Sequence, residues 1–369
     1  MKGQFNMLKE FRVKNFRSFQ DWFVFKLDNV RDYGFNSECI KNNIINKAVV
    51  YGENSSGKSN LGFAIMDIST HLFDGLNQIS PYKNFLNLSS TETEASFVYV
   101  FKFEDDIVEY SYKKDSSKKL TFEEIKENGK IIFQYNYINN KIINNMKDIK
   151  TLKFENNNAN ISMVKFIYNN SVLDNNSPVK RIVDFASNML WFRSIRYFEY
   201  MAANVSSENI NDYIIKNNLI SELEYYFKSF GLNYKLSRFN SLGREIIIAN
   251  FDNGSAPLQD VASTGTMSLW LFFYWMHKNA NISFLFIDEF DAFYHYELSK
   301  NILMSTIKNN KFQSIFTTHN VFLCDNDIMR PDCYFIIKNN KITSFADSTN
   351  KVIRQGHNLE KMMISGEFE

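Results

Sequence analysis

Cysteine and long apolar runs are both scarce in this 369-residue chain. The three cysteines, Cys39, Cys324 and Cys333, lie far apart, with no C-x-x-C pair or histidine cluster beside them. This spacing argues against a disulfide framework or a zinc site, so we expect a cytosolic protein. The longest apolar run, LWLFFYWM at 269–276, is far shorter than the about 20 residues of a bilayer span. The N-terminus lacks an apolar signal core, and the sequence predicts no membrane partner.

An excess of either charge is also missing. Lysine and arginine number 42 against 41 acidic residues, which gives a formal net charge of +1. Charge therefore does not indicate DNA binding, and any DNA contact would depend on a local patch. Lys113, Lys114, Lys118 and Lys119 form one basic cluster, which we interpret as a solvated hairpin. Apolar residues make up 44% of the chain, enough for one large α/β domain or two smaller ones.

A phosphate-binding loop is the first positive signal. The stretch YGENSSGKSNL at 51–61 fits the pattern G-x-x-x-x-G-K-[ST]. The β-branched run at 45–51 predicts a buried strand before it, and apolar residues at helical spacing predict a helix after it. In that setting backbone N–H groups surround the phosphates, Lys58 reaches the β- and γ-phosphates, and the Ser59 hydroxyl ligates Mg²⁺. A flexible turn before a helix is the alternative interpretation.

A pair of carboxylates supplies a hydrolytic element. The stretch FLFIDEFD at 284–291 begins with four apolar residues, which predict a buried strand. Asp288 and Glu289 then stand at its C-terminal end, where α/β sheets hold ligands. We expect Asp288 to hold Mg²⁺ through water and Glu289 to polarise the water beside the γ-phosphate. An acidic helix cap after a strand is the alternative.

A histidine follows a third predicted strand, SIFTT at 314–318. We expect His319 to donate a hydrogen bond to the γ-phosphate, because it ends a strand of the same sheet. His295 lies near the two carboxylates and Asp291, which could suggest a metal site. A packing or interface role is favoured for His295, since Mg²⁺ already has ligands. The other histidines are expected to be packed or solvent-facing: His71, His277 and His357.

With VASTGTMSLW at 261–270, these elements resemble the ABC-type P-loop ATPases of the SMC, RecF and OLD group. GENSSGKSN is similar to that group's G-x-N-x-x-G-K-S-N loop, and STGT at 263–266 is similar to its shortened signature motif. The resemblance implies an α/β fold, the ABC-ATPase P-loop fold with mixed β-sheet, an accompanying antiparallel sheet and a helical insertion. It also implies ATP and Mg²⁺ as cofactors. Finally, it implies a homodimer or higher homo-oligomer in which one protomer's signature closes over its partner's nucleotide. Taken alone, STGT is typical of a helix N-cap.

The resemblance implies site residues on several segments. LKEFRVKNFRSF at 8–19 is similar to the group's first strand and turn, which puts Arg17 and Ser18 near the nucleotide. FDAFYH at 290–295 resembles its D-loop, which puts Asp291 and Ala292 before the dimer partner. The implied nucleotide contacts are Gly52, Asn54, Ser55, Ser56, Gly57, Lys58, Ser59, Asn60, Arg17, Ser263 and Gly265. The implied catalytic residues are Lys58, Glu289 and His319, and the implied metal ligands are Ser59 and Asp288.

The endings RPDCYF at 330–335 and GHNLEKM at 356–362 look like tails of stand-alone ATP-binding subunits found in PARIS-like or restriction-linked phage-defence operons. The sequence has no coiled-coil heptads and no zinc-hook C-x-x-C. The about 50 residues after His319 are too few for a TOPRIM-like nuclease domain. The resemblance therefore implies a separate effector, a nuclease, and a phage-derived trigger.

Three segments are expected along the chain. Residues 1–178 would form an N-terminal nucleotide-binding lobe, including antiparallel hairpins at 95–150 around an acidic turn and an Asn-Gly turn. Residues 179–232, helical in pattern from 180 to 230, would form the insertion. Residues 233–369 would complete the ATPase domain, after a strand pair that leads back to the signature segment.

The leading functional hypothesis is an ATP-hydrolysing switch that dimerises around nucleotide and controls an anti-phage effector. An ATP-locked scaffold with incidental hydrolysis is the second hypothesis, and turnover with and without a trigger would distinguish the two. A RecF- or SMC-like DNA-repair ATPase is the third, and it would show salt-sensitive DNA binding. A P-loop kinase or GTPase is the least favoured, because neither has the Asp–Glu pair with the signature segment.

Overall fold

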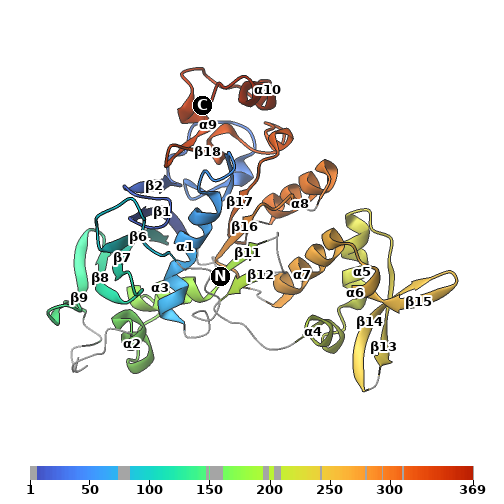
Figure 1. Cartoon of the computed structure of the whole chain (residues 1–369), viewed down its shortest axis with the longest axis horizontal. Coiled ribbons are helices and arrows are strands. Elements are labelled where there is room, and N and C mark those ends of the chain that lie inside the picture. The colour runs from blue at the N-terminus through green and yellow to red at the C-terminus, as the bar shows by residue number, and fades with distance from the viewer. Residues whose placement is uncertain are drawn as a thin grey trace.

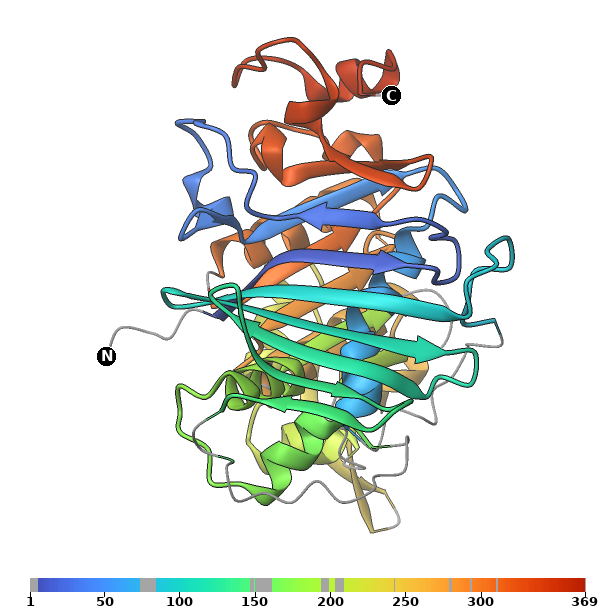
Figure 2. The ribbon, with the colours of Figure 1, turned by 90° about the vertical axis from the view of Figure 1, so that its left-hand side faces the viewer.

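Two seven-stranded sheets enclose the helix that follows the phosphate loop (Figures 1 and 2). The computed structural model describes residues 6–73, 84–146, 149, 161–193, 199–202, 209–241, 243–278, 281–292, 294–309 and 311–368. The fold class is α/β with a mixed sheet and an accompanying antiparallel sheet, which confirms the fold that the resemblance implied.

The first sheet is antiparallel throughout, in the order β10-β9-β8-β7-β6-β1-β2. Its strands are β1 (Asn6–Lys14), β2 (Phe23–Lys26), β6 (Glu94–Phe103), β7 (Asp106–Asp115), β8 (Leu120–Glu127), β9 (Lys130–Asn136) and β10 (Lys141–Asn144). The predicted hairpins are confirmed, since β6 pairs with β7 and β8 with β9. The sheet buries one face against α1, and Figure 2 shows it in front of that helix.

The second sheet carries the candidate site and has the order β12-β11-β16-β17-β5-β18-β19. Its strands are β5 (Lys47–Gly52), β11 (Met189–Arg193), β12 (Glu199–Ala202), β16 (Phe284–Asp288), β17 (Gln313–Thr317), β18 (Tyr334–Lys338) and β19 (Lys341–Ser344). The five central strands are parallel and the two edge strands antiparallel. Parallel strands bring their C-terminal ends to one edge of the sheet, so the three predicted site segments meet there.

The helices lie on both sides of this second sheet. The longer ones are α1 (Lys58–Leu72), α2 (Met163–Asn170), α3 (Pro178–Ser187), α7 (Thr264–Lys278) and α8 (Tyr296–Lys308). Shorter elements are η1 (Ser37–Cys39), β3 (Ile40–Lys41), β4 (Ile44–Ile45), η3 (Val321–Leu323), η4 (Pro331–Cys333), α9 (Phe345–Ser348) and α10 (Leu359–Ile364). Within the described ranges, no helix has both the length and the apolar character needed to cross a membrane.

A third lobe projects from the sheets at the right of Figure 1. It holds α4 (Ile210–Lys216), α5 (Ile220–Ser229), α6 (Leu258–Val261) and the sheet of β13 (Lys235–Ser241), β14 (Arg244–Phe251) and β15 (Gly254–Pro257). The expected strand pair before the signature segment is present as β13 and β14, with β15 added. The lobe has its own apolar cluster, to which α7 contributes Leu269, Trp270 and Phe273.

The helical prediction for 180–230 is wrong in its middle. Met189–Arg193 is strand β11, which pairs with β16, and β12 follows it at Glu199–Ala202. A short, fully apolar run does not distinguish a buried strand from a buried helix, and here tertiary pairing decides. Residues 194–198 and 203–208 lie outside the described part. The division at 178/179 and 232/233 stays a prediction.

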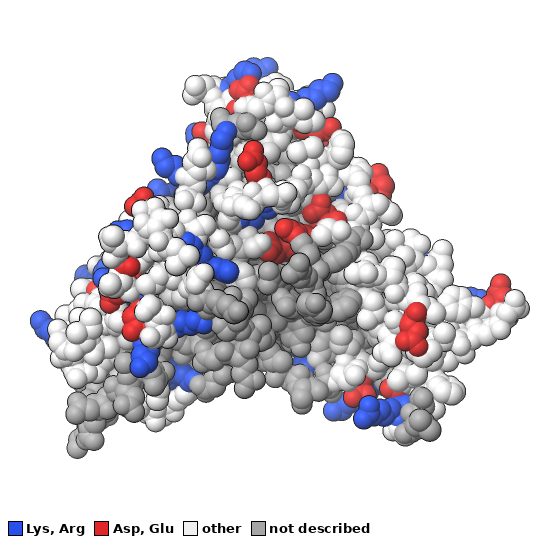
Figure 3. Space-filling model, in the orientation of Figure 1, with Lys and Arg blue, Asp and Glu red and all other residues white. Residues whose placement is uncertain are grey.

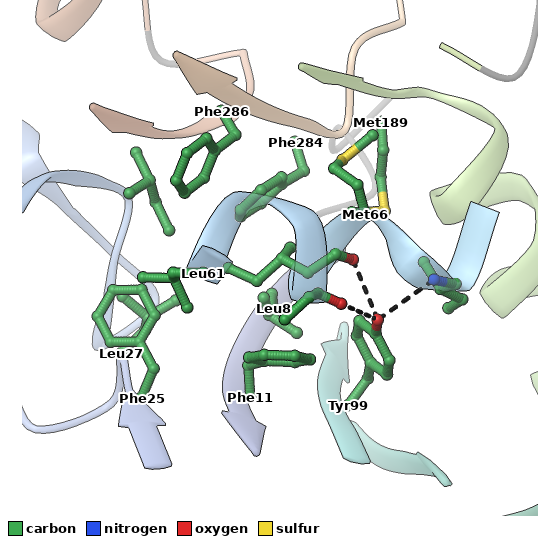
Figure 4. Packing of buried hydrophobic residues seen from close by; sticks show 14 of the residues in the cluster. Leu8, Phe11, Phe25, Leu27, Leu61, Met66, Tyr99, Met189, Phe284 and Phe286 are labelled. Atoms are coloured by element: carbon green, nitrogen blue, oxygen red, sulfur yellow. Dashed lines mark hydrogen bonds between the residues drawn. The ribbon is translucent and has the colours of Figure 1, made fainter. Parts of the chain in front are cut away.

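The position of α1 is set by contacts on two sides. The Tyr99 hydroxyl, on β6, lies 2.9 Å from the Ala64 carbonyl oxygen and accepts from the Ile68 N–H at 3.3 Å (Figure 4). On the opposite side, a Cβ at Gly62 would come within 2.8 Å of the Phe286 ring on β16. Glycine therefore allows the helix to lie directly on the strand that carries the carboxylate pair.

A buried ion pair joins α1 to the antiparallel sheet. The Lys114 ammonium, on β7, donates to an Asp67 carboxylate oxygen at 2.6 Å, and both side chains are 2% exposed. The Tyr112 hydroxyl donates to the same oxygen at 2.8 Å. The interpretation of the basic cluster as solvated is therefore wrong for Lys114, although Lys113 beside it is 47% exposed. The partner, Asp67, is 47 residues away in sequence, which is why local charge patterning does not reveal it.

Replacing Lys114 by methionine should lower the free energy of unfolding by about 3–5 kcal/mol. The variant leaves Asp67 buried without its counter-charge, and an uncompensated buried charge carries that cost. Urea unfolding of wild type and variant would measure it. Lys113→Met is the matched control, with an expected loss below about 1 kcal/mol because Lys113 is exposed. Equal losses of unfolding free energy in the two variants would contradict the importance of the Lys114–Asp67 ion pair.

Candidate functional site

The phosphate loop has glycine where a side chain would not fit. Gly57 caps α1 with a φ of 108°, and a Cβ there would lie 3.2 Å from the Ser18 hydroxyl and 3.3 Å from the Phe19 ring. A Cβ at Gly52 would lie 2.4 Å from the Ser56 hydroxyl and 3.1 Å from a backbone oxygen of β18. A side chain at either position would therefore require neighbouring atoms to move, and at Gly57 it would also be strained by the left-handed backbone.

The remaining loop residues surround the start of α1. Asn54 and Ser55 are exposed at the tip of the loop, whereas Ser56, Ser59 and Asn60 are half-buried. The helix begins at Lys58, so the N–H groups of its first turn have no helical acceptor and point toward the loop. Such a helix start attracts anions through these N–H groups and through the helix dipole.

Lys58 lies folded into the loop. Its ammonium donates to the carbonyl oxygens of Gly52 at 2.8 Å and Glu53 at 3.0 Å, and the residue is 4% exposed. Burial lowers the pKa of Lys58 to about 8, and the carboxylates of Glu289 and Asp288 act in the opposite direction. The ammonium is therefore a partly desolvated cation facing the two acidic residues.

The N-terminal turn packs on the loop and on the helix that follows it. Asn60 donates from its side-chain amide to the Ser18 hydroxyl at 2.8 Å. The Arg17 guanidinium lies over the Phe63 ring on α1, 4.5 Å from its centroid. Ser18 therefore supports the phosphate loop directly, whereas Arg17 packs along the helix that follows. A nucleotide contact by Arg17 stays a prediction.

The carboxylate pair lies at the end of β16. Asp288 is buried, and Glu289 is half-buried with a φ of 47°. Thr317, from the neighbouring strand β17, donates from its hydroxyl to an Asp288 carboxylate oxygen at 2.6 Å. The same hydroxyl accepts from the Glu289 N–H at 2.8 Å. Sequence analysis did not identify Thr317. Its only signal was a hydroxyl residue at the end of the adjacent parallel strand.

His319 lies at the same sheet edge. Its Nε2 is 4.0 Å from a Glu289 carboxylate oxygen, and its side chain is 39% exposed. Partial burial lowers the pKa of His319 below its usual range, and the Lys58 charge adds to this effect, with Asp291 opposing it. Near neutral pH the imidazole is therefore mostly uncharged and can still donate one hydrogen bond. The sheet thus brings together Lys58, the adjacent pair Asp288 and Glu289, and His319, which come from three segments far apart in sequence.

The signature segment lies elsewhere. The Ser263 hydroxyl accepts from the Thr266 N–H at 3.2 Å and so caps α7, and Gly265 is buried while Ser263 is exposed. In Figure 1, α1 lies on one side of β16 and β17 and α7 on the other. Any contact of Ser263 and Gly265 with a nucleotide in a second protomer stays a prediction. Asp291 is half-buried and Ala292 exposed, so both are accessible at the surface.

His295 has a structural role. Its Nδ1 accepts from the Leu298 N–H at 3.2 Å and caps α8. In the part of the chain that the structure describes, no group of three or more His, Cys, Asp or Glu side chains is arranged to hold a metal ion. His71 is half-buried and lies 2.8 Å from the Tyr110 hydroxyl, in keeping with the packed role expected for it.

The residues present fit a nucleoside triphosphate with Mg²⁺. The start of α1 offers backbone N–H groups to an anion, and Lys58 supplies a buried cation beside them. Ser59 in the first turn of α1 and Asp288 at the end of β16 are hard oxygen donors of the kind that Mg²⁺ prefers. Mg²⁺ keeps several waters and phosphate oxygens as ligands, so two protein oxygens are sufficient.

Charge on the surface is mixed. Figure 3 shows lysine and arginine side chains in small groups over this face, with aspartate and glutamate between them. This distribution agrees with the formal net charge of +1. On the part of this face that the structure describes, it indicates no broad basic track of the kind that follows a DNA backbone.

Comparisons with known proteins place these motifs in a family context. A family model described as "AAA domain, putative AbiEii toxin, Type IV TA system" matches residues 47–325. No curated protein matches the chain.

Several solved structures are similar to the chain. One is an SMC head bound to the C-winged helix domain of ScpA, at 14% identity over 91% of this chain and 97% of that one, with a TM-score of 0.48. Another is an SMC head with an extended coiled coil, bound to the C-terminal domain of ScpA derived from Pyrococcus furiosus, at 12% identity over 98% and 99%, with a TM-score of 0.48. A third is the recombination mediator protein RecF with ATP, at 15% identity over 92% and 99%, with a TM-score of 0.43.

ATP affinity should fall as the pH rises above about 8. The charged form of Lys58 binds phosphate, its pKa in the free protein is lowered to about 8, and deprotonation above that value removes the charge. The dissociation constant should rise roughly tenfold per pH unit from about pH 8 upward, until the pKa of the complex is reached. Titration calorimetry with a non-hydrolysable ATP analogue and Mg²⁺ between about pH 7 and about pH 9.5 would measure this. Lys58→Arg should show a flat profile, because guanidinium stays charged. A flat wild-type profile would contradict the role of Lys58.

Proposed function

Because the chain belongs to the family of AAA domains described as putative AbiEii toxin, Type IV TA system, we propose that it is an ATP-hydrolysing switch protein that dimerises around nucleotide in the cytosol. One observation carries the proposal. A phosphate-binding loop, a buried lysine, two carboxylates and a histidine converge on one edge of the parallel sheet.

Each residue has a chemical role in this proposal. Loop N–H groups and Lys58 bind the phosphates, and Ser59 and Asp288 would hold Mg²⁺, which neutralises phosphate charge when bound. Glu289 orients the attacking water and accepts its proton as the bond forms. His319, mostly neutral near pH 7, donates a hydrogen bond to the γ-phosphate. It lies beside Glu289, so both side chains would face the same phosphate.

The dimer is supported by the exposure of Ser263 and Ala292. A helix start such as that of α7 offers N–H groups and hydroxyls to a phosphate, and a second copy would bring it to the nucleotide. By the same proposal the dimer is the sensor subunit of an anti-phage system, triggered by a phage product and acting on a separate nuclease. The family description names a putative toxin of a Type IV toxin–antitoxin system, which supports a role for the chain in a system of more than one component.

Two other functions make different predictions. An ATP-locked scaffold would assemble with ATP but show no trigger-dependent turnover, because it needs bound nucleotide rather than cycling. A DNA-repair ATPase would bind DNA with strong salt dependence and hydrolyse ATP faster in its presence. The mixed surface charge in Figure 3 does not favour the second of these.

Glu289→Gln should lower phosphate release by about 100-fold or more while leaving ATP affinity nearly unchanged, since the base is lost but the phosphate contacts remain. With ATP and Mg²⁺, wild type and Glu289→Gln should double in mass by light scattering, and Lys58→Ala should stay a monomer. Phosphate release on the same samples gives turnover. Glu297→Gln removes one exposed carboxylate from α8 and is the matched control, with wild-type behaviour expected.

Two results would contradict the proposal. Unchanged turnover in Glu289→Gln would remove Glu289 from the reaction. If the molecular mass does not change with ATP in any variant, Ser263 to Thr266 is only a helix cap, and the dimer proposal would be abandoned.

A further inference from the structure

The backbone at Glu289 is in an uncommon conformation. Its φ of 47° is in the left-handed region, which non-glycine residues rarely adopt and retain only when their surroundings hold them there. The residue directly follows β16, so this turn decides the direction in which the Glu289 side chain leaves the strand. The structure must therefore contain contacts that maintain the turn.

Thr317 supplies three of these contacts. Its hydroxyl accepts from the Glu289 N–H at 2.8 Å and donates to an Asp288 carboxylate oxygen at 2.6 Å. Its backbone carbonyl accepts from the Phe290 N–H at 3.2 Å. Three successive residues of the turn are thus tied to a single, fully buried threonine. The hydroxyl uses both its donor and its acceptor capacity, which valine at this position would not reproduce.

The sheet register explains why position 317 can do this. The parallel pairing of β16 and β17 ends at Ile287 and Phe316, so Thr317 is the first residue beyond the last paired position. At this point the ladder no longer supplies partners for the turn, and the threonine side chain takes over that function. The hydrogen bond to one Asp288 oxygen also limits rotation of that carboxylate, as residues behind metal ligands commonly do.

We propose that Thr317 is a positioning residue for ATP hydrolysis. It holds Asp288 and Glu289 in the orientations that the reaction requires, without itself contacting the nucleotide. The inference rests on the proposed hydrolytic function and adds a residue to it. Loss of the hydroxyl removes its hydrogen bonds to the Glu289 N–H and to one Asp288 oxygen. The turn then relaxes toward an ordinary φ, which moves the Glu289 carboxylate away from the water that it orients.

Thr317→Val and Thr317→Ser test the proposal together. Valine keeps the branched shape but loses the hydroxyl, and serine keeps the hydroxyl but loses the methyl group. We expect kcat to fall at least about 10-fold in the valine variant, because small misplacements of a catalytic group have effects of that size or larger. KM and the affinity for a non-hydrolysable analogue should change less than about threefold. The serine variant should stay within about threefold of wild-type kcat.

Hydrogen exchange gives a readout that does not depend on turnover. The Glu289 amide should exchange faster in Thr317→Val than in wild type, and at the wild-type rate in Thr317→Ser. Thr306→Val is the matched control, because Thr306 is a buried threonine whose hydroxyl donates to the Ile302 carbonyl oxygen within α8. It should leave kcat and the Glu289 amide unchanged. If the valine variant does not fold, Thr317→Ala replaces it in every comparison.

The outcomes separate the two levels of inference. Two results would overturn the role of Thr317 while wild type remains active. Either Thr317→Val is as active as wild type, or Thr317→Ser is as impaired as Thr317→Val. Both results leave the hydrolytic proposal standing. Wild type that binds ATP but releases no phosphate overturns both. A fall in affinity that matches the fall in kcat/KM would instead show that Thr317 supports binding, and it too would overturn the positioning role.

Discussion

The packing of α1 between two sheets is the constraint on which the rest of the structure depends. The helix must lie against β16 on one side and β6 on the other, and Gly62 and Tyr99 meet these two requirements. Once α1 is placed, its first turn opens beside the ends of β16 and β17 because those strands run parallel to β5. The distance between Lys58 and the carboxylates therefore follows from the packing of a helix, not from local contacts among the site residues alone.

The far half of α1 packs through buried polar groups as well as apolar ones. Asp67 and Lys114 pair in the interior, and the Glu123 carboxylate nearby accepts from the Tyr110 hydroxyl at 2.6 Å. Burial raises the pKa of Glu123, whereas its hydrogen bonds act in the opposite direction. Burial also lowers the pKa of His71 well below its usual range. Buried pairs of this kind contribute little net stability, but any other register would leave a charge unpaired. They therefore fix how the antiparallel sheet sits on the helix.

Sequence alone predicted the parts of the fold whose signals are local. Three strands were predicted correctly: the one at 45–51 and those that lead to Asp288 and to His319. Each is an apolar run followed directly by a recognisable motif, namely the phosphate loop, the carboxylate pair or the histidine. Strand β11 was missed because no recognisable motif follows its apolar run, and only its pairing with β16 defines it as a strand. Lys114 and Thr317 were missed for a related reason. Their partners are 47 and 28–29 residues away, and no local pattern in the sequence identifies those partners.

Helix α7 links the third lobe to the parallel sheet. Leu269, Trp270 and Phe273 belong to the apolar cluster of the lobe, whereas Tyr274 and Trp275 belong to the main core. One helix thus shares its faces between two clusters, so the lobe cannot shift as a separate body without moving α7 against the sheet. Ser263 caps the exposed start of this helix, and the main-core residues lie further along it. A continuous helix therefore connects the exposed start of α7 with the core that holds β16, the strand that ends at Asp288.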